Sequence, residues 1–260
     1  MAPSPVTYSS YLKLDELLAL QRPGPEHDET LFIIVHQVYE LWFKELLHEL
    51  DYLQGLLRAN DRSRALHTFK RILTVLKVLV AQIDILETMT PLEFLSFRDR
   101  LASGSGFQSF QFRELEFVLG RKSREAIGRY PDGSPQQQRL KTRYAQPVLW
   151  DAFLACLAQN GYGVPKALLS RDPTRLVEPS PDLQRVLVDV YRKDPVTSQV
   201  CERLVDLDEG FQEWRYRHVK MVERTIGTKR GTGGSAGAEY LRTTLHQPAF
   251  PDLWAIRTEL

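Results

Sequence analysis

One predicted helix that ends in a glycine-rich loop most constrains what this chain can fold into. The residues at alternating steps of three and four along it are Leu204, Leu207, Phe211, Trp214, His218 and Met221. This spacing predicts a helix with one buried face. The opposite face carries Glu213, Arg215, Arg217, Lys220 and Arg224. The helix runs into Gly227 and then a loop that contains Gly231, Gly233, Gly234 and Gly237.

His218 is the polar member of the buried face, and it comes shortly before a loop whose backbone can approach a ligand closely. Two interpretations of this histidine are open at this point. A core histidine hydrogen-bonded to a neighbour is the more common situation. A neutral imidazole is also the usual axial ligand of haem iron. The helix alone does not decide between them.

Composition excludes several classes of protein. The chain has 260 residues, with 34 basic and 33 acidic side chains and a formal net charge of +1, so no nucleic-acid-binding charge pattern is present. Cys156 and Cys201 are too few for a disulfide framework and lack the spacing of a metal site. The most apolar run, LFIIVHQVYELWF, is too short to span a bilayer, and the N-terminus does not resemble a signal peptide. We therefore expect a cytoplasmic protein without a membrane segment.

Helical patterns continue through the rest of the chain. We expect helices at about 8–20, 28–58 with Asp28 as its cap, 63–87, 91–101 with Thr90 as N-cap, within 103–120, at 148–157 and at 183–191. The helix over 28–58 carries two adjoining apolar stripes, which places His36 in an apolar environment between partners. No alternating strand pattern of useful length occurs, so the predicted class is all-α, a multi-helix bundle. Residues 121–146 are polar and are expected to form an exposed inserted segment.

The sequence contains none of the common hydrolase, zinc or nucleotide-binding motifs. Residues 231–236 match G-x-G-x-x-A as a string, but they follow a helix rather than a strand, so we reject a dinucleotide site. Two histidines on predicted buried faces remain, His36 and His218, together with Arg98 near apolar residues. Helical bundles build cofactor sites from such inward-facing side chains. The histidines expected at the surface are His27, His48, His67 and His246.

Three long blocks carry a resemblance to a known family. They are HDETLFIIVHQVYELWFKELLHELD, LETMTPLEFLSFRDRLASGSGFQSFQFRELE and WRYRHVKMVERTIGTKRGTGGSAGAEYLR. Together they resemble the tryptophan 2,3-dioxygenase family, haem enzymes that open the indole ring with O2. The match covers the first 120 residues and about 200–245, and it is weak between them. The resemblance implies an all-helical homotetramer with haem b in each subunit, acting on L-tryptophan to give N-formyl-L-kynurenine.

The same resemblance assigns roles to individual residues. It implies that His218 is the proximal iron ligand and that His36 is the catalytic distal residue, which hydrogen-bonds the indole N–H. Phe32 would line the pocket, and Arg98 would bind the substrate carboxylate. Thr232 would bind the amino and carboxylate ends of the substrate as its loop closes. The N-terminal residues Tyr8, Tyr11 and Leu12 would reach into the pocket of a neighbouring subunit.

Phe94 departs from many bacterial relatives, which have a tyrosine whose hydroxyl helps to hold the carboxylate. Animal relatives have phenylalanine there, so we expect activity with an anchor that depends more on Arg98 and Thr232. For His36 two roles stay open, a proton-abstracting base or a positioning acceptor, and family precedent favours positioning. A related haem oxygenase acting on a substituted indole, and a non-enzymatic haem or helical interaction protein, are the alternative functions.

The expected organisation has three parts. Residues 1–27 would form an N-terminal arm and helix that contact a neighbouring subunit. Residues 28–120 and 196–260 would form the haem-binding helical core. Residues 121–195 match the family poorly and would be a small helical and loop insertion.

Overall fold

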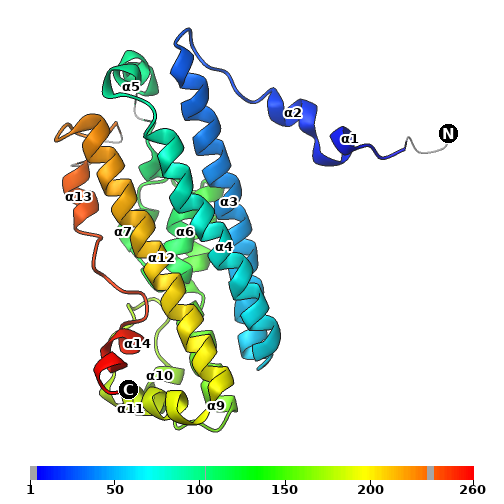
Figure 1. Ribbon diagram of the computed structural model, residues 1–260, viewed down its shortest axis with the longest axis vertical. Helices are drawn as coiled ribbons and strands as arrows, with labels where there is room; N and C mark the ends of the chain where they lie inside the picture. The colour runs from blue at the N-terminus through cyan, green and yellow to red at the C-terminus, as the bar shows by residue number, and fades with distance from the viewer. Residues whose placement is uncertain (1–4, 103, 233–236) are drawn as a thin grey trace.

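Three long helices form the frame of the molecule. The computed structural model describes residues 5–102, 104–232 and 237–260. Helices α3 (His27–Arg58), α4 (Arg62–Leu86) and α12 (Pro195–Ile226) run side by side, with α4 packed against both of the others (Figure 1). At Gly210 of α12 an added Cβ would lie 2.7 Å from Leu76 Cδ2, so glycine permits the close approach of α12 to α4.

Shorter elements complete the fold. They are α1 (Tyr8–Leu12), α2 (Leu14–Leu18), α5 (Pro91–Arg98), η1 (Asp99–Leu101), η2 (Gly106–Gln108), α6 (Phe110–Val118), α7 (Arg124–Ile127), α8 (Pro135–Ala145), α9 (Leu149–Gln159), α10 (Lys166–Leu169), α11 (Pro181–Lys193), α13 (Ala238–Arg242), α14 (Pro251–Ala255) and η3 (Ile256–Thr258). The described residues contain no β-strand, which confirms the predicted all-α class. Within the same residues, no helix is both long and apolar enough to cross a membrane.

Helix ends agree with the sequence in part. Thr90 caps α5 as predicted, and Glu93 completes a capping box with it. The cap predicted at Asp28 is wrong: α3 begins at His27, and its N-cap Glu26 makes no side-chain hydrogen bond to the helix end. The single helix predicted over 8–20 is also wrong, because Lys13 adopts a left-handed conformation (φ 55°) and separates α1 from α2.

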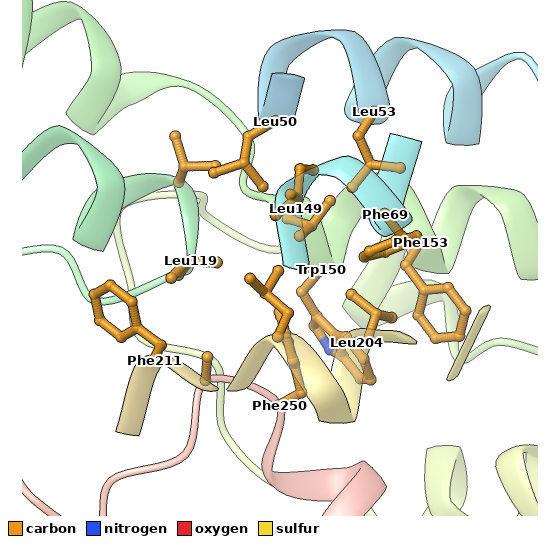
Figure 2. Close-up of a cluster of buried hydrophobic side chains, with 14 of the residues drawn as sticks. Leu50, Leu53, Phe69, Leu119, Leu149, Trp150, Phe153, Leu204, Phe211 and Phe250 are labelled. Atoms are coloured by element: carbon orange, nitrogen blue, oxygen red, sulfur yellow. The ribbon is translucent and has the colours of Figure 1, made fainter. Parts of the chain in front are cut away.

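The main core lies where α3, α4, α9 and α12 meet. Leu50 and Leu53 of α3, Phe69 of α4, and Trp150 and Phe153 of α9 are 2 % exposed or less. Figure 2 shows them facing one another, together with side chains of α12 and the C-terminal segment. Residues beyond 146 therefore supply part of the main core.

The prediction that residues 121–146 form an exposed segment is wrong in part. Helix α8 packs against α6 and α7. Leu140 is fully buried in a second, smaller cluster with Phe117, Ala126 and Ile127. The sequence hides this burial because α8 carries few apolar residues among many polar ones.

The N-terminal helices pack differently from the rest. Helices α1 and α2 extend away from the other helices (Figure 1), and neither contains a buried residue. Arg100 forms ion pairs with Glu26 and Glu29, and Glu29 also accepts the backbone N–H of Gly24 at 2.6 Å. These contacts fix the chain where the N-terminal segment leaves α3.

Candidate functional site

A cavity of about 240 Å³ lies between the long helices at the end where α5 and the glycine loop meet. Its walls come from α3, α4, α5, α6 and α12, from residues 104–109, and from residues 231–232 and 237–244. The candidate site residues among its lining are Phe32, His36, Phe94, Arg98, His218 and Thr232. Segments far apart in the sequence thus bring the predicted side chains to one cavity.

His36 is held in one orientation by its own helix. Its Nδ1 lies 2.7 Å from the carbonyl oxygen of Phe32, one turn earlier, and the Phe32 ring lies 4.1 Å from the imidazole. Because a carbonyl only accepts, Nδ1 of the neutral ring carries the proton, and Nε2 is left as an acceptor. Burial lowers the pKa of His36 below its ordinary value, which keeps the ring neutral.

His218 lies on α12 and is stacked on Trp214, one turn earlier, with ring centroids 5.1 Å apart and an angle of 7°. Burial, with smaller contributions from His36, Arg113 and Arg215, lowers the pKa of His218 to about 4. The imidazole is therefore neutral at physiological pH. Within the part of the chain that the structure describes, the His218 ring contacts Trp214 and lines the cavity, and no hydrogen bond to the ring is found there.

Arg98 presents unused donor capacity to the cavity. Its Nη2 donates to the carbonyl oxygen of Arg230 at 2.5 Å, whereas its Nε is buried and has no hydrogen-bond partner. No Asp or Glu among the described residues forms an ion pair with it. A guanidinium in this state can receive a carboxylate through two parallel hydrogen bonds.

Thr232 and Phe94 lie at the same end of the cavity. The Thr232 hydroxyl donates to the carbonyl oxygen of Gly104 at 2.6 Å, which joins the start of the glycine loop to the segment after α5. Phe94 packs against Phe32, with ring centroids 5.8 Å apart. Residues 233–236, the middle of the glycine loop, lie outside the described residues, so the expected closure of this loop remains a prediction.

Tyr8, Tyr11 and Leu12 do not line the cavity of their own chain. They belong to α1, where the two tyrosines are 75 % and 77 % exposed and Leu12 is 42 % exposed. Large apolar side chains left in solvent on an arm that extends from the helical body are typical of a surface that contacts another chain. Their predicted place in a neighbouring subunit's pocket remains a prediction.

Arg215 lies on the face of α12 opposite the apolar stripe, and it is nevertheless buried. Arg215 is 4 % exposed, forms an ion pair with Glu116 of α6, and lines the cavity. Glu116 also pairs with Arg113 at 2.5 Å, so two guanidinium groups share one carboxylate. Burial lowers the pKa of Arg215 to about 10, which leaves it charged at neutral pH. The sequence feature that could have predicted this buried ion pair is Glu116, a glutamate within the apolar run of α6.

The Nε atoms of Arg113 and Arg215 are buried without a hydrogen-bond partner. This end of the cavity therefore has surplus positive charge and unused donors. The four remaining histidines, His27, His48, His67 and His246, are exposed, as predicted.

A family model for tryptophan 2,3-dioxygenase matches residues 1–159 and 164–260. The chain belongs to the tryptophan 2,3-dioxygenase family. A tryptophan 2,3-dioxygenase of Herpetosiphon aurantiacus is 62 % identical over 258 residues, which cover 98 % of both chains. One of Anaeromyxobacter sp. is 58 % identical over 256 residues, 98 % of this chain and 96 % of the relative. One of Caulobacter vibrioides is 44 % identical over 260 residues, 98 % of both chains.

Family membership makes the protein an enzyme, a dioxygenase of the oxidoreductase class. The non-enzymatic alternative is therefore set aside. The similarity also extends through most of residues 121–195, where the three sequence blocks gave only a weak match.

Proposed function

We propose that the protein cleaves the C2–C3 bond of the indole ring of L-tryptophan with O2 and forms N-formyl-L-kynurenine, the first step of tryptophan breakdown by the kynurenine route. The carrying observation is that one cavity holds two complementary groups, the acceptor Nε2 of His36 and the unpaired donor Nε of Arg98. Tryptophan offers an indole N–H to the first group and a carboxylate to the second.

Haem b suits the residues of the cavity. His218 offers a neutral imidazole without a hydrogen-bond partner among the described residues, which is the form that binds haem iron. Arg113 and Arg215 supply surplus positive charge and free Nε donors for the haem carboxylates. When bound, the haem supplies the activation of O2.

The protein would act mainly by placing the substrate. We propose that His36 Nε2 accepts the indole N–H while Phe32 and Phe94 pack against the ring system. The tautomer set by the Phe32 carbonyl favours positioning over proton abstraction, because the buried imidazole resists protonation. Arg98 would pair with the carboxylate, and Thr232 would bind the amino acid end. Phe94 has no hydroxyl, so the anchor depends on these two polar side chains.

The assembly belongs to the same proposal. We propose a cytoplasmic homotetramer in which residues 1–27 contact a neighbouring subunit, with Tyr8, Tyr11 and Leu12 reaching its pocket. The full exposure of α1 within its own chain supports this role. Residues 28–120 and 196–260 would form the haem-binding part, and residues 121–195 would support it.

One experiment tests the proposed reaction. Purified, haem-loaded and reduced protein is incubated with L-tryptophan and O2, and the products are identified by mass. We expect N-formyl-L-kynurenine containing both oxygen atoms of labelled O2. Oxygenation of a substituted indole without turnover of tryptophan would favour the related oxygenase instead. The absence of any oxygenated product would contradict the proposal.

A further inference from the structure

One wall of the cavity is a segment with little regular structure of its own. Gly104, Ser105, Gly106, Phe107 and Ser109 line the cavity, and residues 104–109 are here called the wall segment. Its regular structure is the short turn η2, in which the Phe107 N–H donates to the Ser105 hydroxyl at 3.2 Å. Such a segment needs contacts from outside to keep one shape.

Residues 129 and 130 supply two of these contacts. The Arg129 guanidinium lies 4.2 Å from the centre of the Phe107 ring, a close cation–π distance. The Tyr130 hydroxyl donates to the carbonyl oxygen of Gln108 at 3.1 Å. Burial raises the pKa of Tyr130 to about 12, so its hydroxyl keeps its proton at physiological pH. Two neighbouring side chains therefore hold a ring and a carbonyl of the same wall segment.

The smaller hydrophobic cluster holds residues 129 and 130 in place. Tyr130 packs against the cluster of Phe117, Ala126, Ile127 and Leu140. Gln137 Nε2 donates to the Tyr130 carbonyl at 3.3 Å. Helix α8 is itself fixed to α6 by ion pairs from Arg139 and Arg143 to the buried Glu114, at 2.6 Å and 2.9 Å. The contacts to the wall segment therefore start from a packed support.

The wall segment leads directly to the substrate-anchoring end of the cavity. Its Gly104 carbonyl accepts the Thr232 hydroxyl at 2.6 Å. Among the described residues, none between 117 and 213 lines the cavity. Residues 129 and 130 therefore lie outside the cavity lining, and they contact that lining at the wall segment.

We propose that Arg129 and Tyr130 are positioning residues that hold the wall segment, and through Gly104 the hydroxyl of Thr232, in the geometry that receives the amino acid end of the substrate. This gives the smaller hydrophobic cluster, which does not reach the cavity, a role in substrate binding. The inference rests on the proposed function for its substrate. The support of the wall itself can be measured without substrate.

The test compares two tyrosine variants of the haem-loaded enzyme. Tyr130→Phe removes the hydroxyl that binds Gln108 and keeps the ring in the cluster. Tyr144→Phe is the matched control: its ring packs on Phe117 at 5.8 Å in the same cluster, and its hydroxyl accepts Arg124 Nε at 3.3 Å away from the wall. Both variants lose one hydroxyl from the same cluster.

We expect Tyr130→Phe to speed amide hydrogen exchange across residues 104–112 about fivefold without substrate, the factor typical of one hydrogen bond. The KM for tryptophan should rise by about the same factor, while kcat and the haem absorption spectrum stay unchanged. Tyr144→Phe should change neither the exchange of 104–112 nor KM. Arg129→Met added to Tyr130→Phe should increase both effects.

Three results would overturn the inference. They are exchange across 104–112 that is unchanged in Tyr130→Phe, faster exchange with an unchanged KM, and equal rises of KM in the two tyrosine variants. If the wild-type enzyme does not act on tryptophan, the proposed function fails separately. The exchange comparison then still decides whether Tyr130 holds the wall.

Discussion

Arg98 offers the sharpest test of how the substrate is bound. In the free protein its Nη2 donates to the Arg230 carbonyl at 2.5 Å, its Nε has no partner, and the described residues place no carboxylate against it. A bound tryptophan carboxylate would take up this donor capacity. Arg98→Leu removes the guanidinium and leaves the carboxylate without its partner charge.

The expected cost follows from these contacts. Truncating one partner of a desolvated, hydrogen-bonded charge pair costs about 2–5 kcal/mol. Binding of the carboxylate loses the hydrogen bond to the Arg230 carbonyl, about 1 kcal/mol, and satisfies the buried Nε, which recovers about 1–3 kcal/mol. The net correction is a gain of about 0–2 kcal/mol, smaller than the spread of the 2–5 kcal/mol range. At about 1.4 kcal/mol for each tenfold step, tryptophan binding should weaken about 30- to 4,000-fold.

The assay measures the dissociation constants of tryptophan and of tryptamine, which lacks the carboxylate, for wild type and Arg98→Leu. Tryptamine binding should change far less than tryptophan binding. Arg171→Leu is a matched control, because Arg171 pairs with Asp151 at 2.5 Å and does not line the cavity. Equal weakening of both ligands by Arg98→Leu would show that Arg98 is structural and would refute the reasoning.

Three further predictions concern the other groups of the cavity. His218→Ala should lose haem or change its absorption spectrum grossly, whereas His36→Ala should keep a normal haem content; equal haem loss in both would contradict the assignment of sides. Thr232→Ala should raise KM about tenfold, since it removes one hydrogen bond to a charged group, and should leave the haem spectrum unchanged. Because the pKa of His36 is lowered from its ordinary value of 6.5, tryptophan KM should stay constant as pH falls through 6.5 and rise only at more acid pH, where protonation converts Nε2 from acceptor to donor. The wild-type KM could instead rise with a midpoint at pH 6.5 or above, while the KM of His36→Gln stays constant. That result would show that the pKa of His36 is not lowered, and it would contradict the prediction.

Periodicity predicted the long helices well because each has a continuous apolar stripe. The stripes of α3 and α12 placed His36 and His218 on buried faces, and both histidines line the cavity. Helix ends were harder to predict, since the choice between Glu26 and Asp28 as a cap depends on how the preceding segment approaches. Arg100 holds that segment through Glu29 and Glu26, which lie 71 and 74 positions earlier in the sequence.

The sequence did not predict which polar residues are buried, for a related reason. Arg215 looks like a surface residue on its own helix and is buried because Glu116, 99 positions away, meets it. Helix α8 likewise reads as a polar segment, although Gln137 and Leu140 are buried against α6 and α7. A polar side chain is buried only when a distant partner satisfies it, and local pattern carries no information about that partner.

The sequence by itself determined the all-α class, the two inward-facing histidines and, through three long blocks, the family. These depend on residue type and short-range spacing, which helical geometry converts directly into faces. Tertiary structure alone decided the unpaired Nε of Arg98, the shared carboxylate of Glu116, and the support of the wall segment by residues 129 and 130. Each of these depends on the distance between atoms on packed elements, which the chain fixes only once the helices have met.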